Sequence, residues 1–241
     1  MKPSNDQELV CGINAVKEII SIRPRSVLKL LLQDEKQNSR IESLSSLAKM
    51  NHIEIILEDG NFFEHNFIEQ NHQGVSILCN KRLEENETFL EKLLEKENLL
   101  ILILDHLTDP HNVGACLRSA AAAGADAVIV PKNRSCHLTP TVRKISSGGS
   151  ELMPFIVVTN LNRSIKRLSD SGVKIIGAVA DTGKNHTEID MKGSAAFIIG
   201  SEDKGLKRLT AEKCDTLAAI DMPGGIDSLN ASVTAGIILF E

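Results

Sequence analysis

The feature that most constrains the fold of this 241-residue chain is an unbroken apolar run, LLILIL, at residues 99–104. The run is too short to cross a membrane as a helix, and it suits a strand that is buried on both faces. Strand and helix patterns then alternate to residue 241. Because parallel strands need crossover connections, this alternation predicts an α/β unit with a parallel sheet covered on both sides by helices.

The expected strands of this unit recur at 99–104, 127–130, 155–158, 173–178, 195–199 and 216–220. Its expected helices lie at about 112–124, 140–146, 161–171, 206–214 and 229–240. Residues 1–80 predict a smaller α/β domain, with strands at 27–33, 53–57 and 74–79 and helices at 12–20, 40–50 and 59–67. The charged stretch 81–98 lacks core-strand character, so we interpret it as a linker with a helical second half, before the larger domain 99–241.

Composition excludes several classes of protein. No apolar run is long enough for a bilayer, and the polar start of the chain has no signal-peptide core, so we expect a cytoplasmic protein without a membrane anchor. The five cysteines are odd in number and form no Cys-x-x-Cys pair, which favours reduced thiols. His111 with Cys136 and His137 lacks a second closely spaced pair of ligands, and we expect no metal.

The charge distribution permits nucleic-acid binding but does not require it. The net charge is −5, yet residues 118–144 hold five basic side chains against Asp126 alone. The five are Arg118, Lys132, Arg134, Arg143 and Lys144. A phosphate-binding patch needs only such a local excess. A solvated surface with chance clustering explains the excess about as well.

Three segments rich in glycine, proline and polar residues follow three expected strands, at 105–114, 200–205 and 221–230. Ligands of an open parallel sheet bind outside the carboxyl ends of its strands. The shared position of the three segments therefore predicts a binding site at this edge of the sheet.

The first segment leads into a helix that Asp109 can cap and that Pro110 can begin. Asn112 falls in its first turn, and Arg118 lies off its apolar stripe and should face outward. The stripe that we expect to be buried is Val113, Cys116, Leu117, Ala120, Ala121 and Gly124. A capped helix with an ordinary surface arginine explains the segment equally well.

The other two segments narrow the class of ligand. Glu202 lies in a glycine-bounded turn, but Leu206 stands where a phosphate-binding loop needs lysine, and no Gly-x-Gly-x-x-Gly follows a strand. Nucleoside triphosphates and dinucleotides are therefore disfavoured. Ser228 suits the N-cap of the last helix. We expect that helix to pack inward through Leu229, Val233, Gly236, Ile237 and Phe240.

Taken together and in order, DxxTDPHNVGACLRSA, IIGSEDKG and IDMPGGIDSLNASVTAG resemble the three signature motifs of the SpoU (TrmH-type) RNA 2'-O-ribose methyltransferases. The match covers nearly all of the second unit. GINAV at 12–16 and HQG at 72–74 resemble the amino-terminal RNA-binding domain of the bacterial branch that methylates a guanosine of 23S ribosomal RNA. The run DPHNVGACLRSAAAAGADAVIVPKNRS is especially similar to that branch.

The resemblance implies properties that the spacing of residues does not. It implies a SPOUT-type catalytic domain with a carboxy-terminal trefoil knot, and an amino-terminal domain similar to ribosomal protein L30e that selects the RNA. The implied cofactor is S-adenosyl-L-methionine. The implied active unit is a homodimer in which both chains build each site.

Family roles carried onto matching positions give two sets of site residues. The catalytic group would be Asn112, Arg118, Glu202, Ser228 and Asn230. The cofactor contacts would be Gly200, Ile220 and Leu229, with Met222 as a neighbour.

Arg118 is the base proposed for the family, although arginine has a pKa above about 12 and normally stays charged. It either loses its proton on binding or, as we prefer, stays charged, clamps a phosphate and stabilises the forming alkoxide.

Three other functions remain open. The chain could be a non-catalytic RNA-binding protein on the same scaffold, although Arg118, Glu202 and Asn230 are all present. It could methylate transfer RNA or another ribosomal site. It could also be an unrelated α/β enzyme that acts on a small metabolite. Without tryptophan or tyrosine, any base stacking must use Phe, His or Arg.

Overall fold

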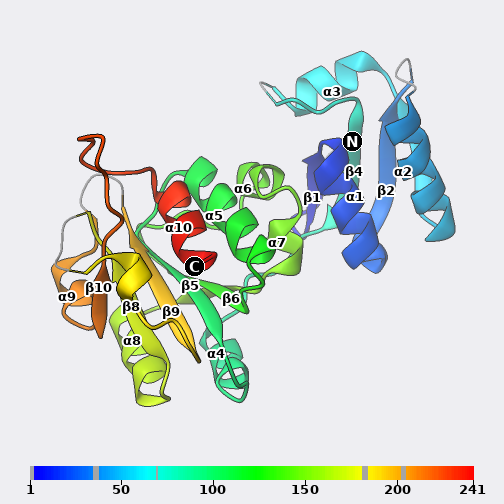
Figure 1. The fold of residues 1–241 in the computed structure, drawn as a ribbon. Coiled ribbons are helices and arrows are strands. Elements are labelled where there is room, and N and C mark those ends of the chain that lie inside the picture. Colours follow the sequence, from blue (N-terminus) through cyan, green and yellow to red (C-terminus); the bar gives the residue numbers. More distant parts are fainter. Residues whose placement is uncertain (1–2, 35–37, 69, 181–183, 202–204) are drawn as a thin grey trace.

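Two separate sheets organise the protein in a computed structural model, which describes residues 3–34, 38–68, 70–180, 184–201 and 205–241 (Figure 1). The first sheet has the order β1-β4-β2-β3, in which β4 pairs antiparallel with β1 and β2, and β2 pairs parallel with β3. Its strands are β1 (Gln7–Cys11), β2 (Val27–Gln33), β3 (Glu54–Glu58) and β4 (Val75–Asn80). Its helices are α1 (Ile13–Ile22), α2 (Ser39–Met50) and α3 (Gly60–Asn66), with a 3-10 helix at Pro24–Ser26.

Strand β1 is the element of this unit that the sequence does not predict. Glu8 and Val10 are its fully buried alternating positions, so a charged residue occupies an inward position. A charge at that position breaks the apolar alternation by which half-buried strands are recognised. The buried carboxylate of Glu8 pairs with Arg23 of the same unit and with Arg143 of the second unit.

Parallel strands form the second sheet throughout the described residues, in the order β10-β8-β9-β5-β6-β7. The predicted parallel sheet is therefore confirmed, and the predicted strand ends agree with the observed ones to within two residues. The strands are β5 (Leu100–Asp105), β6 (Ala127–Pro131), β7 (Phe155–Val158), β8 (Lys174–Ala178), β9 (Ala195–Gly200) and β10 (Thr216–Ala218).

The run LLILIL supplies the central strand β5, and its side chains are buried on both faces of the sheet. Leu102 and Leu104 pack with α5, α6 and α10, whereas Ile101 and Ile103 pack with α4 and α8. Figure 1 shows these two helical layers on opposite sides of the sheet. The helices are α4 (Glu87–Leu93), α5 (Pro110–Ala122), α6 (Pro140–Ile145), α7 (Gly149–Leu152), α8 (Leu161–Asp170), α9 (Arg208–Ala211) and α10 (Ala231–Leu239), with a 3-10 helix at His186–Glu188.

Helix α5 forms as the sequence predicts. The Asp109 side chain accepts a hydrogen bond from the His111 N–H at 3.1 Å, and Pro110 begins the helix. The expected stripe is buried at Val113, Cys116, Leu117 and Ala120, whereas Ala121 is half-buried and Gly124 is exposed. Arg118 is exposed, as expected.

Helix α10 corrects two predictions. Asn230, not Ser228, is its N-cap, because the helix begins at Ala231 and the Asn230 side chain accepts from the Ser232 N–H at 2.9 Å. Its buried side chains are Ala231, Ala235, Ile238 and Leu239, and the predicted inward residues Val233 and Phe240 are 47% and 64% exposed. The polar residues of the helix, Ser232 and Thr234, do not form a separate polar face, so the periodicity cannot identify the inward face.

The stretch interpreted as a linker packs against the second sheet. Leu90 and Leu93 of α4 join the core beside α8. Glu85 forms a β-bridge with Ile156, and the Glu84 carboxylate accepts from the Leu138 N–H at 2.8 Å. Residues 84–93 are therefore an outer part of the second unit.

A buried network of ion pairs joins the two units, and we call it the junction cluster: Glu8, Arg23, Arg82, Arg143 and Glu151. The Arg143 guanidinium lies 3.1 Å from Glu8 Oε2 through Nε and 2.9 Å from Glu151 Oε1 through Nη1. Arg23 also pairs with Glu151, and Arg82 donates to the backbone carbonyls of Glu151 and Met153. The cluster fixes the first unit against α6 and α7, which pack on α5 (Figure 1).

The junction cluster corrects the charge interpretation. Arg143 belongs to the basic run at 118–144, but its side chain is only 2% exposed and contacts two carboxylates. It therefore cannot form a phosphate-binding patch with Arg134, which is exposed.

Three findings concern membrane spans, metal sites and disulfide bonds. No helix of the described residues is long and apolar enough to span a membrane. The same residues contain no group of three or more His, Cys, Asp or Glu side chains placed to hold a metal ion. The five cysteines are free thiols.

Candidate active site

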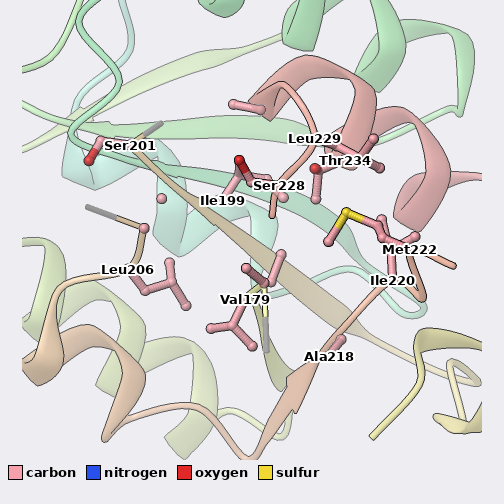
Figure 2. Close-up of a pocket in the computed structure, with 15 residues that line it drawn as sticks. Val179, Ile199, Ser201, Leu206, Ala218, Ile220, Met222, Ser228, Leu229 and Thr234 are labelled. Atoms are coloured by element: carbon pink, nitrogen blue, oxygen red, sulfur yellow. The ribbon is translucent and has the colours of Figure 1, made fainter. Parts of the chain in front are cut away.

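A cavity of about 420 Å³, which we call the apolar cavity, opens at the carboxyl ends of β8, β9 and β10 beside the start of α10 (Figure 2). Residues at 178–180, 199–201, 205–206, 218–222 and 228–234 contribute to its lining. Two of the three segments that the sequence singles out, 200–205 and 221–230, thus meet here. This is the position at which parallel sheets bind ligands.

Glycine at position 200 is required by a close backbone contact. A Cβ atom there would lie 2.1 Å from the carbonyl carbon of Gly205 and 2.4 Å from the Leu206 nitrogen. Ser201 and Gly205 exchange two backbone hydrogen bonds, and Gly205 has a φ of +61°. Any side chain at position 200 would therefore collide with the backbone of Gly205 and Leu206, which lies against the end of β9, and Gly200 and Gly205 both line the cavity.

The wall of the apolar cavity is formed mainly by apolar groups. Figure 2 shows Met222, Ser228, Leu229 and Thr234 grouped around the start of α10, with Val179 and Leu206 toward the opposite side. The four residues expected to contact the cofactor, Gly200, Ile220, Met222 and Leu229, all line the cavity. Apolar side chains beside exposed backbone groups suit a flat heterocycle whose edge carries hydrogen-bonding atoms.

Asn112 and Asn230 link the first and third segments directly. Nδ2 of Asn230 donates to Oδ1 of Asn112 at 2.9 Å, and the Asn112 side chain is buried. Oδ1 of Asn230 at the same time accepts from the Ser232 N–H and hydroxyl. The starts of α5 and α10 are therefore fixed to each other at the edge of the cavity.

The remaining expected catalytic residues have different positions. Ser228 lines the cavity and is exposed. Arg118 lies on the exposed side of α5, six residues beyond Asn112, and does not line the cavity of its own chain. Glu202 lies outside the described residues.

The lining residues that sequence reasoning did not single out include Val179, Ala218 and Thr234. Val179 directly follows β8, so the rule that ligands bind beyond strand ends could have found it. Ala218 carries no motif signal, and Thr234 lies within the third motif but has no role assigned by the resemblance. They line the cavity only because β10 and the first turns of α10 come together there.

One thiol lies beneath the cavity. Sγ of Cys214 lies 2.7 Å from the position that a Cβ on Gly177 would take, in β8. Burial raises the pKa of Cys214 to about 12, so it stays a neutral thiol at physiological pH. It packs as a small apolar group and gives the site no thiolate nucleophile.

Two family models match the chain. One, described as the SpoU rRNA Methylase family, matches residues 99–240. The other, described as RNA 2'-O ribose methyltransferase substrate binding, matches residues 9–84.

Relatives align along almost the whole chain. It is 42% identical to a 23S rRNA (guanosine-2'-O-)-methyltransferase RlmB of Coxiella burnetii, over 96% of this chain and 93% of that protein. It is 39% identical to the protein of the same name of Pseudomonas putida, over 97% of this chain and 95% of that protein.

A solved structure has the same fold. The SpoU methyltransferase AviRb from Streptomyces viridochromogenes, in complex with AdoMet, superposes with a TM-score of 0.80 at 21% identity. The match covers 98% of this chain and 88% of that one.

Proposed function

The chain belongs to the SpoU rRNA methylase family, and from this premise we propose that it transfers a methyl group from S-adenosyl-L-methionine to the ribose 2'-hydroxyl of a guanosine in 23S ribosomal RNA. The observation that carries the proposal is 42% identity over 96% of the chain to a methyltransferase named for that reaction. We propose the cytoplasm as the site of action.

The apolar cavity supports the choice of cofactor. Its volume of about 420 Å³ falls within the range of small-molecule sites. Ile220 and Leu229 offer apolar surfaces on which an adenine would pack, and the glycine turn at 200 exposes backbone groups toward its edge. The trefoil knot of the family stays a prediction for this chain.

When bound, S-adenosyl-L-methionine supplies a methyl group that is already activated on a sulfonium. The protein has to hold the ribose 2'-oxygen in line and to stabilise it as it loses its proton. The Asn112–Asn230 hydrogen bond supports a positioning role, because it fixes the helix that carries Arg118 against the helix that begins at the cavity.

Arg118 is the residue that we propose to act on the RNA. A charged guanidinium can bind the neighbouring phosphate through two parallel hydrogen bonds and stabilise negative charge on the 2'-oxygen. Its exposed position on α5 leaves it accessible to a large substrate. We therefore propose a charged clamp, with Glu202 and Ser228 completing the group.

We further propose that the protein works as a homodimer in which each site takes Arg118 from the other chain. Leu152, Val233 and Phe240 are 57%, 47% and 64% exposed, an apolar surface on α7 and at α10. Exposed apolar patches of this kind mark interfaces. Because Arg118 does not line its own cavity, a second copy would supply what one chain lacks.

The direct test is transfer of labelled methyl from S-adenosyl-L-methionine to unmodified 23S ribosomal RNA, followed by nuclease digestion and identification of the labelled nucleoside. We expect the label in 2'-O-methylguanosine. Label in transfer RNA instead would support the proposed methyl transfer but would contradict 23S ribosomal RNA as the substrate. No binding of the cofactor would overturn the whole proposal.

Mixing two inactive variants tests the shared site. Arg118→Ala damages the clamp and Gly200→Val fills the glycine turn, so each variant alone should be inactive. In mixed dimers one site keeps an intact cavity and an intact partner arginine. Random exchange should then restore about a quarter of wild-type activity, because half of the dimers are mixed and half of their sites are complete. No recovery after verified exchange would show that each chain builds its own site.

A further inference from the structure

A second cavity, of about 530 Å³, lies at the same edge of the sheet, and we call it the basic cavity. The loops after β5, β6 and β7 and the residues around the start of α9 line it. Leu206 lines the apolar cavity and the next residue, Lys207, lines the basic cavity. The two cavities are therefore on either side of one short stretch of chain.

The position of Lys207 is fixed by a chain of hydrogen bonds that begins on β5. The buried Asp105 carboxylate pairs with Nδ1 of His106 and also accepts from the Lys207 backbone N–H at 3.3 Å. Nζ of Lys207 lies 2.7 Å from Nε2 of His106. Because an ammonium can only donate, Nε2 is the acceptor and Nδ1 carries the proton toward Asp105. The Lys207 ammonium is therefore held at the cavity with N–H groups to spare.

Arg134 reaches the cavity from a firmly held loop. Lys132 N–H donates to the Val158 carbonyl at 2.8 Å, and Cys136 N–H donates to the Leu107 carbonyl at 2.8 Å. Arg134 itself has a φ of +57°, so this loop holds an arginine in the left-handed region. In the part of the chain that the structure describes, its guanidinium forms no ion pair.

The charges of the lining do not balance. Asp105 is buried and already bonded. Arg208 also lines the cavity, but it is paired at 2.8 Å with Glu212, which does not line it. Arg134 and Lys207 thus remain as cations without a carboxylate partner among the described residues. Such a pair attracts an anion, and a backbone phosphate is the anion that an RNA-modifying enzyme meets.

The uncharged lining suits the rest of a nucleotide. Asn133, Asn160 and Asn162 contribute amide groups. Oδ1 of Asn162 is buried and accepts no hydrogen bond within the described residues. A buried acceptor without a partner calls for a donor from the ligand, such as a ribose 2'-hydroxyl or a base amino group. Bare phosphate would leave this atom unsatisfied.

We infer that the basic cavity binds one nucleotide of the RNA substrate next to the nucleotide that is methylated, with Arg134 and Lys207 on its phosphate. This inference rests on the proposed function, since it assumes an RNA substrate. Binding at a neighbouring nucleotide would set the distance of the target ribose from the apolar cavity through the peptide between Leu206 and Lys207.

The test measures the affinity of the full-length protein for unmodified 23S ribosomal RNA, with the affinity for S-adenosyl-L-methionine measured in parallel. The variants are Arg134→Asn, which suits a left-handed backbone, and Lys207→Gln. The matched control is Lys166→Gln, which removes one charge from the outer side of α8, where Lys166 is 64% exposed and pairs with Asp170.

Each cavity variant should raise the dissociation constant for the RNA about tenfold and reduce its salt dependence by about one phosphate contact. The affinity for S-adenosyl-L-methionine should stay within about twofold of wild type, which also shows that the variants fold. RNA affinity equal to that of the Lys166→Gln control would overturn the inference while methyl transfer by the wild-type protein still supported the proposed function. If the wild-type protein neither bound nor methylated RNA, the proposed function and this inference would both fall.

Discussion

Two groups of basic side chains in this protein are close in sequence but lie in opposite surroundings. Arg143 in the junction cluster is 2% exposed and contacts Glu8 and Glu151. Arg118 and Arg134, in the same basic run, are exposed and form no ion pair among the described residues. The first kind of cation holds two units together, and the second kind is available to a polyanion.

The two groups differ in what the protein would lose if the cation were removed by mutation. Removal of one partner from a buried ion pair leaves an uncompensated charge in a poorly solvated place, which lowers the free energy of unfolding. Removal of an exposed, unpaired cation costs the fold almost nothing and weakens only an interaction with a ligand. The comparison therefore predicts that variants will separate into a stability class and a function class.

The largest effect should come from Arg118→Ala. If Arg118 clamps phosphate and stabilises the 2'-oxygen, the rate of methyl transfer should fall by roughly 10²–10³-fold. The melting temperature should stay within about 1 °C of wild type, because the side chain is exposed. Methyl-transfer kinetics measure the expected fall in rate, and thermal unfolding measures the melting temperature. A fully active Arg118→Ala protein would remove Arg118 from the function class.

Arg143→Ala should show the opposite pattern. The substitution leaves the Glu8 and Glu151 carboxylates buried beside an empty position, and we expect a loss of about 3–5 kcal/mol in the free energy of unfolding. Urea unfolding measures it, with Lys144→Ala, the neighbouring and less buried residue, as the control. Equal stability of the two variants would mean that the junction cluster does not hold the units together.

Salt should separate the two classes without any mutation. Affinity for RNA should fall about tenfold or more between 50 and 200 mM salt if three cations neutralise phosphates, because released counterions oppose binding. The melting temperature should change little over the same range, since buried pairs are poorly screened. Filter binding and thermal unfolding in the same buffers give both values. A large fall in the melting temperature over the same salt range would mean that solvent screens the junction pairs and that they are exposed.

The sequence predicted what depends on local pattern and missed what depends on partners. Asp109, Pro110 and the buried stripe of α5 follow from capping and a 3.6-residue period, and the structure confirms them, apart from the end of the stripe. The parallel sheet follows from the alternation after LLILIL. In contrast, β1 was missed because Glu8 occupies a core position, which is tolerable only because Arg143 is present far along the chain.

In the candidate site, too, the features that depend on local pattern were predicted and those that depend on distant partners were not. The three segments at strand ends were found because parallel strands present their carboxyl ends at one edge. The inward face of α10 was predicted wrongly, since Val233 and Phe240 are exposed while Ala235 is buried. A helix whose few polar residues do not form one face has no periodic signal, and the inward face of α10 is set by its contact with α5. Likewise, nothing local distinguishes Arg143 from Arg134, because their difference is made by Glu8 and Glu151.

The smallest effect, and the finest test of the comparison, is the pH dependence that Glu8 contributes. Burial raises the pKa of Glu8, and the nearby Arg143 and Arg23 lower it by less. Between its unfolded and its folded pKa the folded protein holds the extra proton, so this group's contribution to stability is present at low pH and is lost as pH rises through the folded value. The glutamine in Glu8→Gln cannot ionise, so this variant should not lose stability in this way as the pH rises. The free energy of unfolding of Glu8→Gln minus that of wild type should therefore become more positive from about pH 4.5 upward. Urea unfolding across this range measures the difference, with Glu54→Gln, an exposed residue paired with Lys29, as the control. A difference that instead becomes more negative as pH rises would mean that the Arg143 and Arg23 pairs outweigh burial, and that the junction cluster is stabilised by its charges.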